Sequence, residues 1–154
     1  MTLNRPTLVL IATLGSAALL LGALAFQFIG ELPPCKMCYW QRYPHVAAVM
    51  AGALWFFAHT RLLIWIGALS ALTTGLIGVY HAGVEQDWWE GPTTCTSGNI
   101  SGLSTDELLD QIMNAPLVRC DEIPWEMLGL SMAGWNAVIS LGLAAIWFAA
   151  ALRR

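Results

Sequence analysis

Long apolar segments separated by short polar ones dominate the pattern of hydrophobic and polar positions along the chain. The expected helices cover residues about 7–29, 40–58, 62–82 and 127–152. The first, Thr7–Ile29, has 23 residues without a charge. At 1.5 Å per residue it makes a helix of about 34 Å, which is enough to cross the hydrocarbon core of a bilayer. The pattern therefore predicts transmembrane helices.

The second segment is the weakest of the four. Tyr43–Ala58 has 16 residues without an acidic or basic side chain other than histidine, short of the roughly 20 that a spanning helix needs. It becomes long enough if Cys38–Arg42 joins the helix and the Arg42 side chain extends to the membrane surface. We count it as a span because an odd number of spans would not fit the distribution of charge.

Charged residues are distributed unequally between the two sides of the predicted membrane. All ten acidic residues are Glu31 or lie within Glu85–Glu126. Four of the seven basic residues fall within 11 positions, which are Met1–Pro6, His59–Arg61 and Arg153–Arg154. Positive charge close to short loops marks the cytoplasmic side. We therefore expect both termini to be cytoplasmic, and loops 30–39 and 83–126 to face the periplasm.

Composition agrees with the membrane interpretation. The 154 residues are 57% hydrophobic and 11% charged, against roughly 25% charged in ordinary globular proteins. We expect one membrane domain, 1–154, folded as an all-α antiparallel four-helix transmembrane bundle. Its close helix contacts are expected at five glycines, which are Gly15, Gly22, Gly75, Gly78 and Gly142. The net charge of −3 gives no electrostatic reason to expect nucleic-acid binding.

A cleaved signal peptide is an alternative interpretation of the first apolar segment. Ala23–Ala25 has the small-x-small pattern of a cleavage site. However, the segment is much longer than the apolar core of a signal peptide, and only Arg5 precedes that core. A transmembrane helix is therefore favoured.

The second outer loop contains a short amphipathic pattern. Ser104 and Glu107 have the spacing of a capping box, and Pro116 would end a helix that begins there. Its apolar residues, Leu108, Leu109, Ile112 and Met113, share one helical face. We predict a short surface helix that lies on the membrane or packs against the bundle.

Four cysteines are the candidates for chemistry, and all four lie in the predicted outer loops. Cys35 and Cys38 form a C-x-x-C motif, and Cys95 and Cys120 lie in the second loop. Two structural disulfides are possible, but a C-x-x-C bridge closes too short a loop to remove much chain entropy. The motif directly precedes a helix, whose N-terminus favours a thiolate. We therefore interpret Cys35–Cys38 as a redox pair with an exposed first sulfur.

Metal and haem sites fit this spacing less well. All-cysteine zinc sites normally contain two C-x-x-C knuckles, whereas Cys95 and Cys120 are 25 residues apart. Haem attachment needs a histidine directly after the second cysteine, and Tyr39 occupies that position. Nothing in the spacing favours an iron–sulfur cluster.

The chain resembles the bacterial disulfide bond formation protein B (DsbB) family over nearly its whole length. The segment that carries most of this resemblance is Cys35-Lys36-Met37-Cys38-Tyr39-Trp40-Gln41-Arg42. The resemblance rests on four spans, a C-x-x-C in the first outer loop with an arginine four residues later, and a cysteine pair in the second outer loop. It implies an inner-membrane oxidoreductase that forms disulfides.

The resemblance also implies roles for individual residues. Cys35 and Cys38 would exchange electrons with a membrane quinone, ubiquinone or menaquinone, with Cys38 next to the ring. Cys95 would meet a periplasmic thioredoxin-like thiol oxidant, with Cys120 as its resolving partner. Arg42 matches the quinone-site arginine of the family. His81 matches a histidine near the quinone only roughly, because its spacing to Cys95 requires a gap. An arginine this close to a span could otherwise be an interfacial anchor.

Two other functions are compatible with parts of this pattern. The vitamin K epoxide reductase-like proteins are also four-helix, quinone-linked thiol oxidases, but their C-x-x-C heads the last bundle helix. Here the C-x-x-C comes first, which favours the DsbB-like order. The non-enzymatic alternative is a membrane scaffold stapled by disulfides, whose cysteines would stay oxidised in the presence of a reduced partner.

Overall fold

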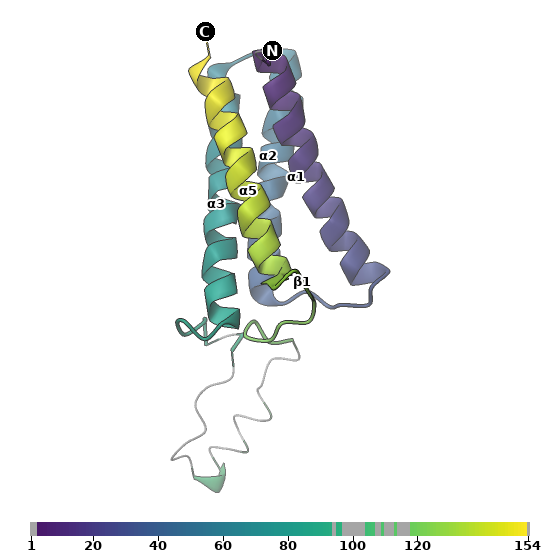
Figure 1. Ribbon diagram of the computed structural model, residues 1–154, viewed down its shortest axis with the longest axis vertical. Helices are drawn as coiled ribbons and strands as arrows, with labels where there is room; N and C mark the ends of the chain where they lie inside the picture. The colour runs from purple at the N-terminus through teal and green to yellow at the C-terminus, as the bar shows by residue number, and fades with distance from the viewer. Residues whose placement is uncertain are drawn as a thin grey trace.

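The computed structural model contains four long helices in the part of the chain that it describes, which is residues 3–93, 95–96, 104–106, 109, 113 and 118–153. They are α1 (Arg5–Phe28), α2 (Lys36–Ala58), α3 (Arg61–Glu85) and α5 (Met132–Leu152). Successive helices alternate in direction (Figure 1). The start of α1, the α2–α3 turn and the end of α5 therefore lie together at one end of the bundle. The other two connections lie at the opposite end.

The helices pack around a core of small residues and a few large ones. α3 contacts α2 and α5 extensively, α1 contacts the same two helices, and α1 and α3 barely meet. α1 and α3 are thus diagonal neighbours. Trp147 of α5 is fully buried against Gly67 of α3, where a Cβ would lie 2.7 Å from the indole ring. A bulky ring fits the core here because the facing position has no side chain.

The glycines expected at helix contacts divide into two groups. A Cβ at Gly15, Gly75 or Gly78 would lie within 3.0 Å of an atom in another helix. Gly22 and Gly142 have nothing within 4 Å of such a Cβ, so the prediction was wrong for these two. Periodicity alone did not reveal which side of α1 and α5 faces a neighbouring helix.

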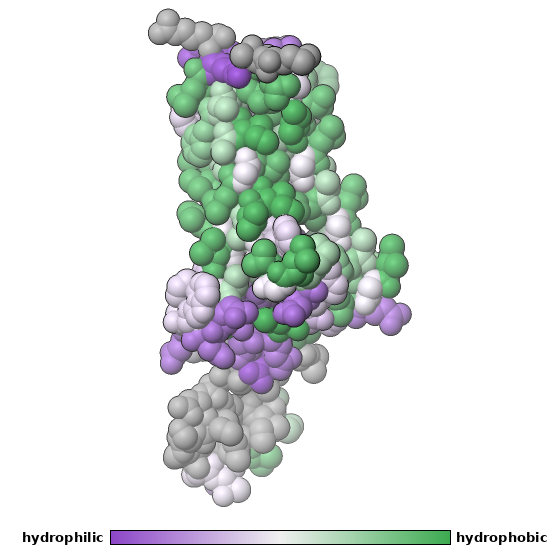
Figure 2. Space-filling view, in the orientation of Figure 1, coloured by the Kyte–Doolittle hydropathy of each residue, from purple (hydrophilic) through white to green (hydrophobic). Residues whose placement is uncertain are grey.

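The surface of the bundle matches a membrane protein. Among the described residues, three helices are long and apolar enough to cross a bilayer: α1, α3 and α5. On the face that Figure 2 shows, a broad hydrophobic band covers the helices, with hydrophilic residues at both ends. α2 is as long but less apolar, because it carries Gln41, Arg42 and His45. These side chains contribute to the site described below.

The last helix begins later than the sequence pattern predicted. Instead of a helix from residue 127, Glu126–Met127 (β1) and Leu130–Ser131 (β2) form a small antiparallel hairpin. Leu128 and Gly129 make its turn with positive φ angles, which an α-helix cannot include. Ser131 then caps α5 by accepting a hydrogen bond from the Gly134 amide. Hydropathy alone does not separate these apolar hairpin residues from the helix that follows them.

The other boundaries also differ from the expected ones. α2 begins at Lys36, so Cys38–Arg42 belongs to it, and α3 continues to Glu85. The predicted surface helix at residues 104–113 lies largely outside the described residues.

Candidate redox site

The C-x-x-C motif lies at the start of α2, at the end of the bundle away from the termini. Cys35 is the N-cap of the helix, and its Sγ accepts a hydrogen bond from the Cys38 amide at 3.2 Å. The first amides of a helix have no partner within the helix. The Cys35 sulfur therefore meets the positive end of the helix dipole, as the sequence analysis expected.

The two sulfurs of the motif are neighbours but differ in exposure. Their Sγ atoms lie 2.7 Å apart, and neither cysteine is in a disulfide. Cys35 is 5% exposed, whereas Cys38 is half-buried; the expectation of an exposed first sulfur was wrong. The hydrogen bond with Cys38, and then burial, raise the pKa of the Cys35 thiol. Of the two sulfurs, Cys38 is the more accessible.

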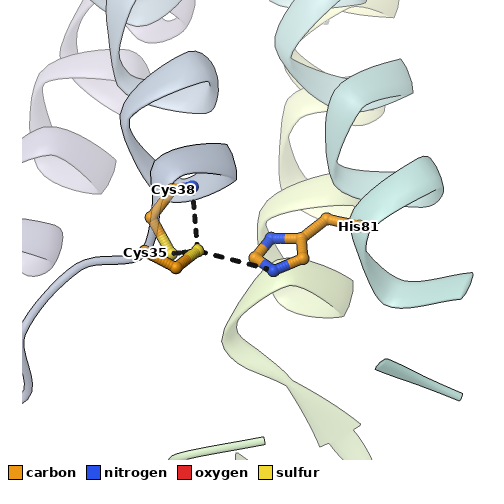
Figure 3. Close-up of side chains that lie close together, drawn as sticks. All are labelled: Cys35, Cys38 and His81. Atoms are coloured by element: carbon orange, nitrogen blue, oxygen red, sulfur yellow. Dashed lines mark hydrogen bonds between the residues drawn. The ribbon is translucent and has the colours of Figure 1, made fainter. Parts of the chain in front are cut away.

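His81 of α3 connects the motif to the second cysteine pair. Its Nε2 lies 3.6 Å from Cys35 Sγ (Figure 3) and 3.1 Å from the Cys120 carbonyl oxygen. Its Nδ1 is 2.8 Å from Gln41 Nε2. Because an amide nitrogen only donates, Nδ1 accepts here and Nε2 carries the hydrogen. His81 thus directs an N–H at both the Cys120 carbonyl and the Cys35 sulfur.

Cys95 and Cys120 form a disulfide, a pairing that the cysteine spacing alone had left open. Their Cα atoms are 5.4 Å apart, and both residues are buried in one cluster with Cys35, Met37 and Val84. All four cysteines therefore converge on one place. Both sulfurs of the loop pair are therefore shielded from solvent.

A salt bridge flanks the disulfide on the second loop. The Arg119 guanidinium donates to both carboxylate oxygens of Asp121, at 3.0 and 2.6 Å. This pairing holds the pKa of Asp121 below its ordinary value. Arg119 and Asp121 are the two neighbours of Cys120, so their salt bridge restrains the chain around that sulfur.

A cavity of about 690 Å³ opens beside the motif, and Cys38, Arg42 and His81 are among its lining residues. Arg42 donates to Gln27 Oε1 at 2.5 Å and to the Ala23 carbonyl oxygen at 3.1 Å, both on α1. The guanidinium therefore reaches sideways across the cavity towards α1. Arg42 thus has its hydrogen-bond partners within the bundle and lines the cavity.

Sequence reasoning missed a buried polar network behind the cysteines. The Asn136 side chain of α5 donates to Gln41 Oε1 at 2.8 Å and lies 2.9 Å from His45 Nε2. Glu85 accepts a hydrogen bond from Ser131 and lies 3.8 Å from His81 Nε2. A signal was available, because polar residues within apolar helices usually have a function or a specific partner.

Two cysteine pairs that lie next to each other can pass a disulfide from one pair to the other by thiolate attack. A bundle of membrane helices that carries such pairs at one end defines a membrane thiol–disulfide oxidoreductase.

Comparison with known proteins gives the family. Residues 5–150 match the family described as disulfide bond formation protein DsbB, and the chain belongs to this family. "Disulfide bond formation protein B" of Idiomarina loihiensis is 31% identical over 91% of this chain and 81% of its own. The protein of the same name from Dechloromonas aromatica is 34% identical over 87% and 86%. No solved structure matches. The protein is thus a disulfide-generating oxidoreductase of the membrane.

Proposed function

We propose that the protein is a quinone-dependent thiol oxidase of the bacterial inner membrane. It reoxidises a periplasmic thioredoxin-like oxidant and passes the electrons to ubiquinone or menaquinone. The observation that carries this proposal is the convergence of both cysteine pairs beside a cavity that Cys38 and Arg42 line. The name shared by the relatives, disulfide bond formation protein B, supports the same reaction.

The proposed electron path runs from the second loop to the first. A thiolate of the partner attacks the Cys95 sulfur and releases Cys120, and the second partner thiol then completes the transfer. The reduced loop pair in turn reduces a Cys35–Cys38 disulfide. Two electrons and two protons thereby reach Cys35 and Cys38 while the partner leaves with a disulfide. Packing of the four cysteines in one cluster supports this order.

The cavity suits a lipophilic ring with polar oxygens. Its volume of about 690 Å³ is within the roughly 300–1,000 Å³ range of small-molecule sites. Apolar side chains such as Leu19, Phe26 and Ile139 line it, while Cys38 and Arg42 supply polar groups. These residues fit a quinone, which when bound supplies the acceptor for the two electrons and two protons of the dithiol.

Arg42 and His81 have distinct electrostatic roles in the proposal. Both groups that accept hydrogen bonds from Arg42 are neutral, so its positive charge remains available to the cavity. In a medium of low dielectric this charge stabilises a Cys38 thiolate or a ring oxygen that gains electron density. His81 directs its Nε2–H at Cys35 and so favours negative charge on that sulfur during exchange.

The proposed topology places all four helices across the membrane, with 1–154 as one domain. α2 packs against both α1 and α3, which supports a span despite its lower hydropathy. Both termini and the α2–α3 turn would be cytoplasmic. The cysteine end would then face the periplasm, where disulfides persist.

Quinone reduction by the purified protein tests the proposed reaction. With a reduced thioredoxin-like partner, wild type should reduce a soluble quinone analogue and release oxidised partner in equal amounts. Cys35→Ser and Cys38→Ser should abolish both, because no disulfide can then form next to the cavity. Oxidation of the partner without quinone consumption would contradict the proposal.

A trapping experiment tests the order of the relay. In Cys120→Ser the free Cys95 thiol can attack the disulfide of the oxidised partner and release one partner thiol. Without Cys120 to resolve it, a mixed disulfide between Cys95 and the partner should accumulate on a non-reducing gel. Cys95→Ser should form none. Because both residues are buried, the partner must displace part of the second loop, and trapping should be slow compared with exchange between small thiols. Full oxidation of partner by Cys95→Ser would show that the relay order is wrong.

A further inference from the structure

Three metal-binding side chains from two helices converge at the C-x-x-C motif. The sulfurs of Cys35 and Cys38 and a ring nitrogen of His81 all lie within 4.8 Å of one another. Cys35 and Cys38 lie at the start of α2, and His81 lies near the end of α3 (Figure 3). Cys35 is 5% and His81 3% exposed, so water competes little for these ligand atoms.

We propose that the reduced protein binds one zinc ion through Cys35, Cys38 and His81, and that this ion inhibits the oxidase. Zinc prefers cysteine sulfur and imidazole nitrogen in a tetrahedral arrangement. The inference rests on the proposed function only in that turnover generates the reduced dithiol. The sequence did not indicate this site because its third ligand, His81, comes from a different helix.

The distances require little movement to reach zinc geometry. With Zn–S of about 2.3 Å and Zn–N of about 2.1 Å, a tetrahedral site places sulfur and nitrogen about 3.6 Å apart and two sulfurs about 3.8 Å apart. Cys35 Sγ and His81 Nε2 are already 3.6 Å apart. The two sulfurs are 2.7 Å apart, so they must separate by about 1 Å. Cys38 lines the cavity, which provides the space.

Gln41 can support the imidazole in the form that zinc needs. A metal-bound Nε2 must be free of hydrogen, so the ring hydrogen has to move to Nδ1. Gln41 faces Nδ1 at 2.8 Å, and its amide accepts that hydrogen after a half-turn that exchanges Oε1 and Nε2. Because Asn136 donates to Gln41 Oε1, the Asn136 amide must turn with it. Such an acceptor behind a histidine ligand typically changes metal affinity by about 10–100-fold.

Glu85 favours a cation at the same place. Its Oε1 lies 3.8 Å from His81 Nε2, and its side chain is 3% exposed. On binding, the hydrated zinc ion gives up waters, two S–H bonds break, two Zn–S bonds and one Zn–N bond form, and two protons leave to solvent. One water would remain as the fourth ligand. No electrons move, so the cysteines stay reduced. The electrons of the dithiol are then unavailable to an acceptor, which is the basis of inhibition.

The test uses the full-length protein with Cys95→Ser and Cys120→Ser, so that only the C-x-x-C thiols remain. The protein is held in detergent and kept reduced by a phosphine under argon. Zinc affinity is measured by competition with a chromogenic chelator, and cadmium reports thiolate ligands by ultraviolet charge-transfer absorption. We expect one ion per chain, and at least tenfold weaker binding in His81→Ala. His59→Asn is the matched control at the other end of α2, and asparagine tolerates its positive φ of 51°.

Gln41 variants distinguish a three-ligand site that includes His81 from chelation of zinc by the two thiols alone. Gln41→Leu removes the acceptor and should weaken zinc binding about tenfold, whereas Gln41→Glu keeps an acceptor and should retain or strengthen it. Equal affinity in the Cys95→Ser, Cys120→Ser parent and in its His81→Ala and Gln41→Leu derivatives would overturn the proposal, as would absence of stoichiometric binding.

Inhibition is measured separately on the protein with all four cysteines. Zinc should slow quinone reduction, and a chelator should restore it; zinc-insensitive turnover would refute the inhibitory role. Because binding is measured without turnover, a protein that binds zinc and does not reduce quinone refutes only the proposed function.

Discussion

Arg42 shows how one side chain acquires its role from another helix. The residue lies four positions after Cys38, on the same face of α2 and one turn deeper. Gln27 and the Ala23 carbonyl of α1 hold the guanidinium, and the Tyr39 ring lies 5.4 Å from it. Gln27 therefore acts as a positioning residue: it fixes where the charge of Arg42 is directed.

Replacing Arg42 should impair the use of quinone more than folding. In Arg42→Gln the positive charge beside the cavity is lost, so kcat/KM for quinone should fall at least tenfold, equivalent to about 1.4 kcal/mol. Arg42→Lys keeps the charge without the planar fork and should be intermediate. Gln27→Leu should mainly raise the KM for quinone, because Arg42 loses its orientation. Steady-state kinetics with saturating partner and varied quinone measures these effects. Unchanged kinetics in Arg42→Gln would make Arg42 an interfacial anchor.

At the residue scale, the sequence was informative where a motif is local. The C-x-x-C, the first turns of the helix that begins there and the arginine one turn after Cys38 all lie within eight consecutive residues. The contacts of His81 with Cys35 and Cys120 join residues that are 46 and 39 positions apart. Such contacts depend on how helices pack, and no spacing rule within a single sequence contains them.

At the scale of helices, the α3–α5 contact depends on the absence of a side chain. Trp147 is fully buried, and three of its ring atoms lie 2.7–2.8 Å from the position of a Cβ on Gly67. Real Cβ atoms do not approach this closely, and a rigid indole cannot bend away as a flexible chain would. A methyl group at residue 67 must therefore move the two helices apart or displace the ring.

Gly67→Ala should destabilise the bundle by about 1–3 kcal/mol, the usual cost of overpacking a core. Gly142→Ala on α5 is the matched control, because nothing lies within 4 Å of a Cβ there and alanine is the better helix former. It should be neutral or slightly stabilising. Thermal unfolding in detergent, followed by circular dichroism, compares the two. Equal melting temperatures would show that α3 and α5 pack differently from this arrangement.

Hydropathy predicted a helix boundary correctly only where the sequence becomes polar at the point where the helix ends. The last helix was predicted to begin at residue 127, but the hairpin before Met132 is also largely apolar, so hydropathy could not separate the two. In α2, hydropathy instead underestimates a membrane span. Gln41, Arg42 and His45 lower the apolar character of this helix, although they face the site and the core. The polarity that weakens α2 as a membrane span is therefore the polarity of the functional site.

At the scale of the whole molecule, charge and chemistry are separated along the long axis. Arg5, Arg61 and Arg153 lie at one end of the bundle, and the cysteines lie at the other. The hydrophobic band between these ends is visible in Figure 2. The positive-inside rule then assigns the arginine end to the cytoplasm. The cysteines would face an oxidising space, as the reaction requires.

Cysteine reporters at the two ends test this orientation. The native cysteines are poor reporters because Cys35, Cys95 and Cys120 are buried, so the test uses a variant with all four replaced by serine. Glu90→Cys places an exposed thiol at the cysteine end, and Thr60→Cys places one in the α2–α3 turn. Thr60 makes no capping hydrogen bond through its side chain, so the exchange should cost little stability.

A membrane-impermeant maleimide added to intact spheroplasts should label the Glu90→Cys variant and leave the Thr60→Cys variant unlabelled. Permeabilisation should then make both reactive, which shows that the second thiol was shielded by the membrane and not by the fold. The reverse pattern would place the disulfide chemistry in the cytoplasm, where thiols are kept reduced. That outcome would overturn the proposed orientation, and with it the route from a periplasmic partner through Cys95 to the quinone. Labelling of both variants in intact spheroplasts would mean that α3 does not cross the membrane.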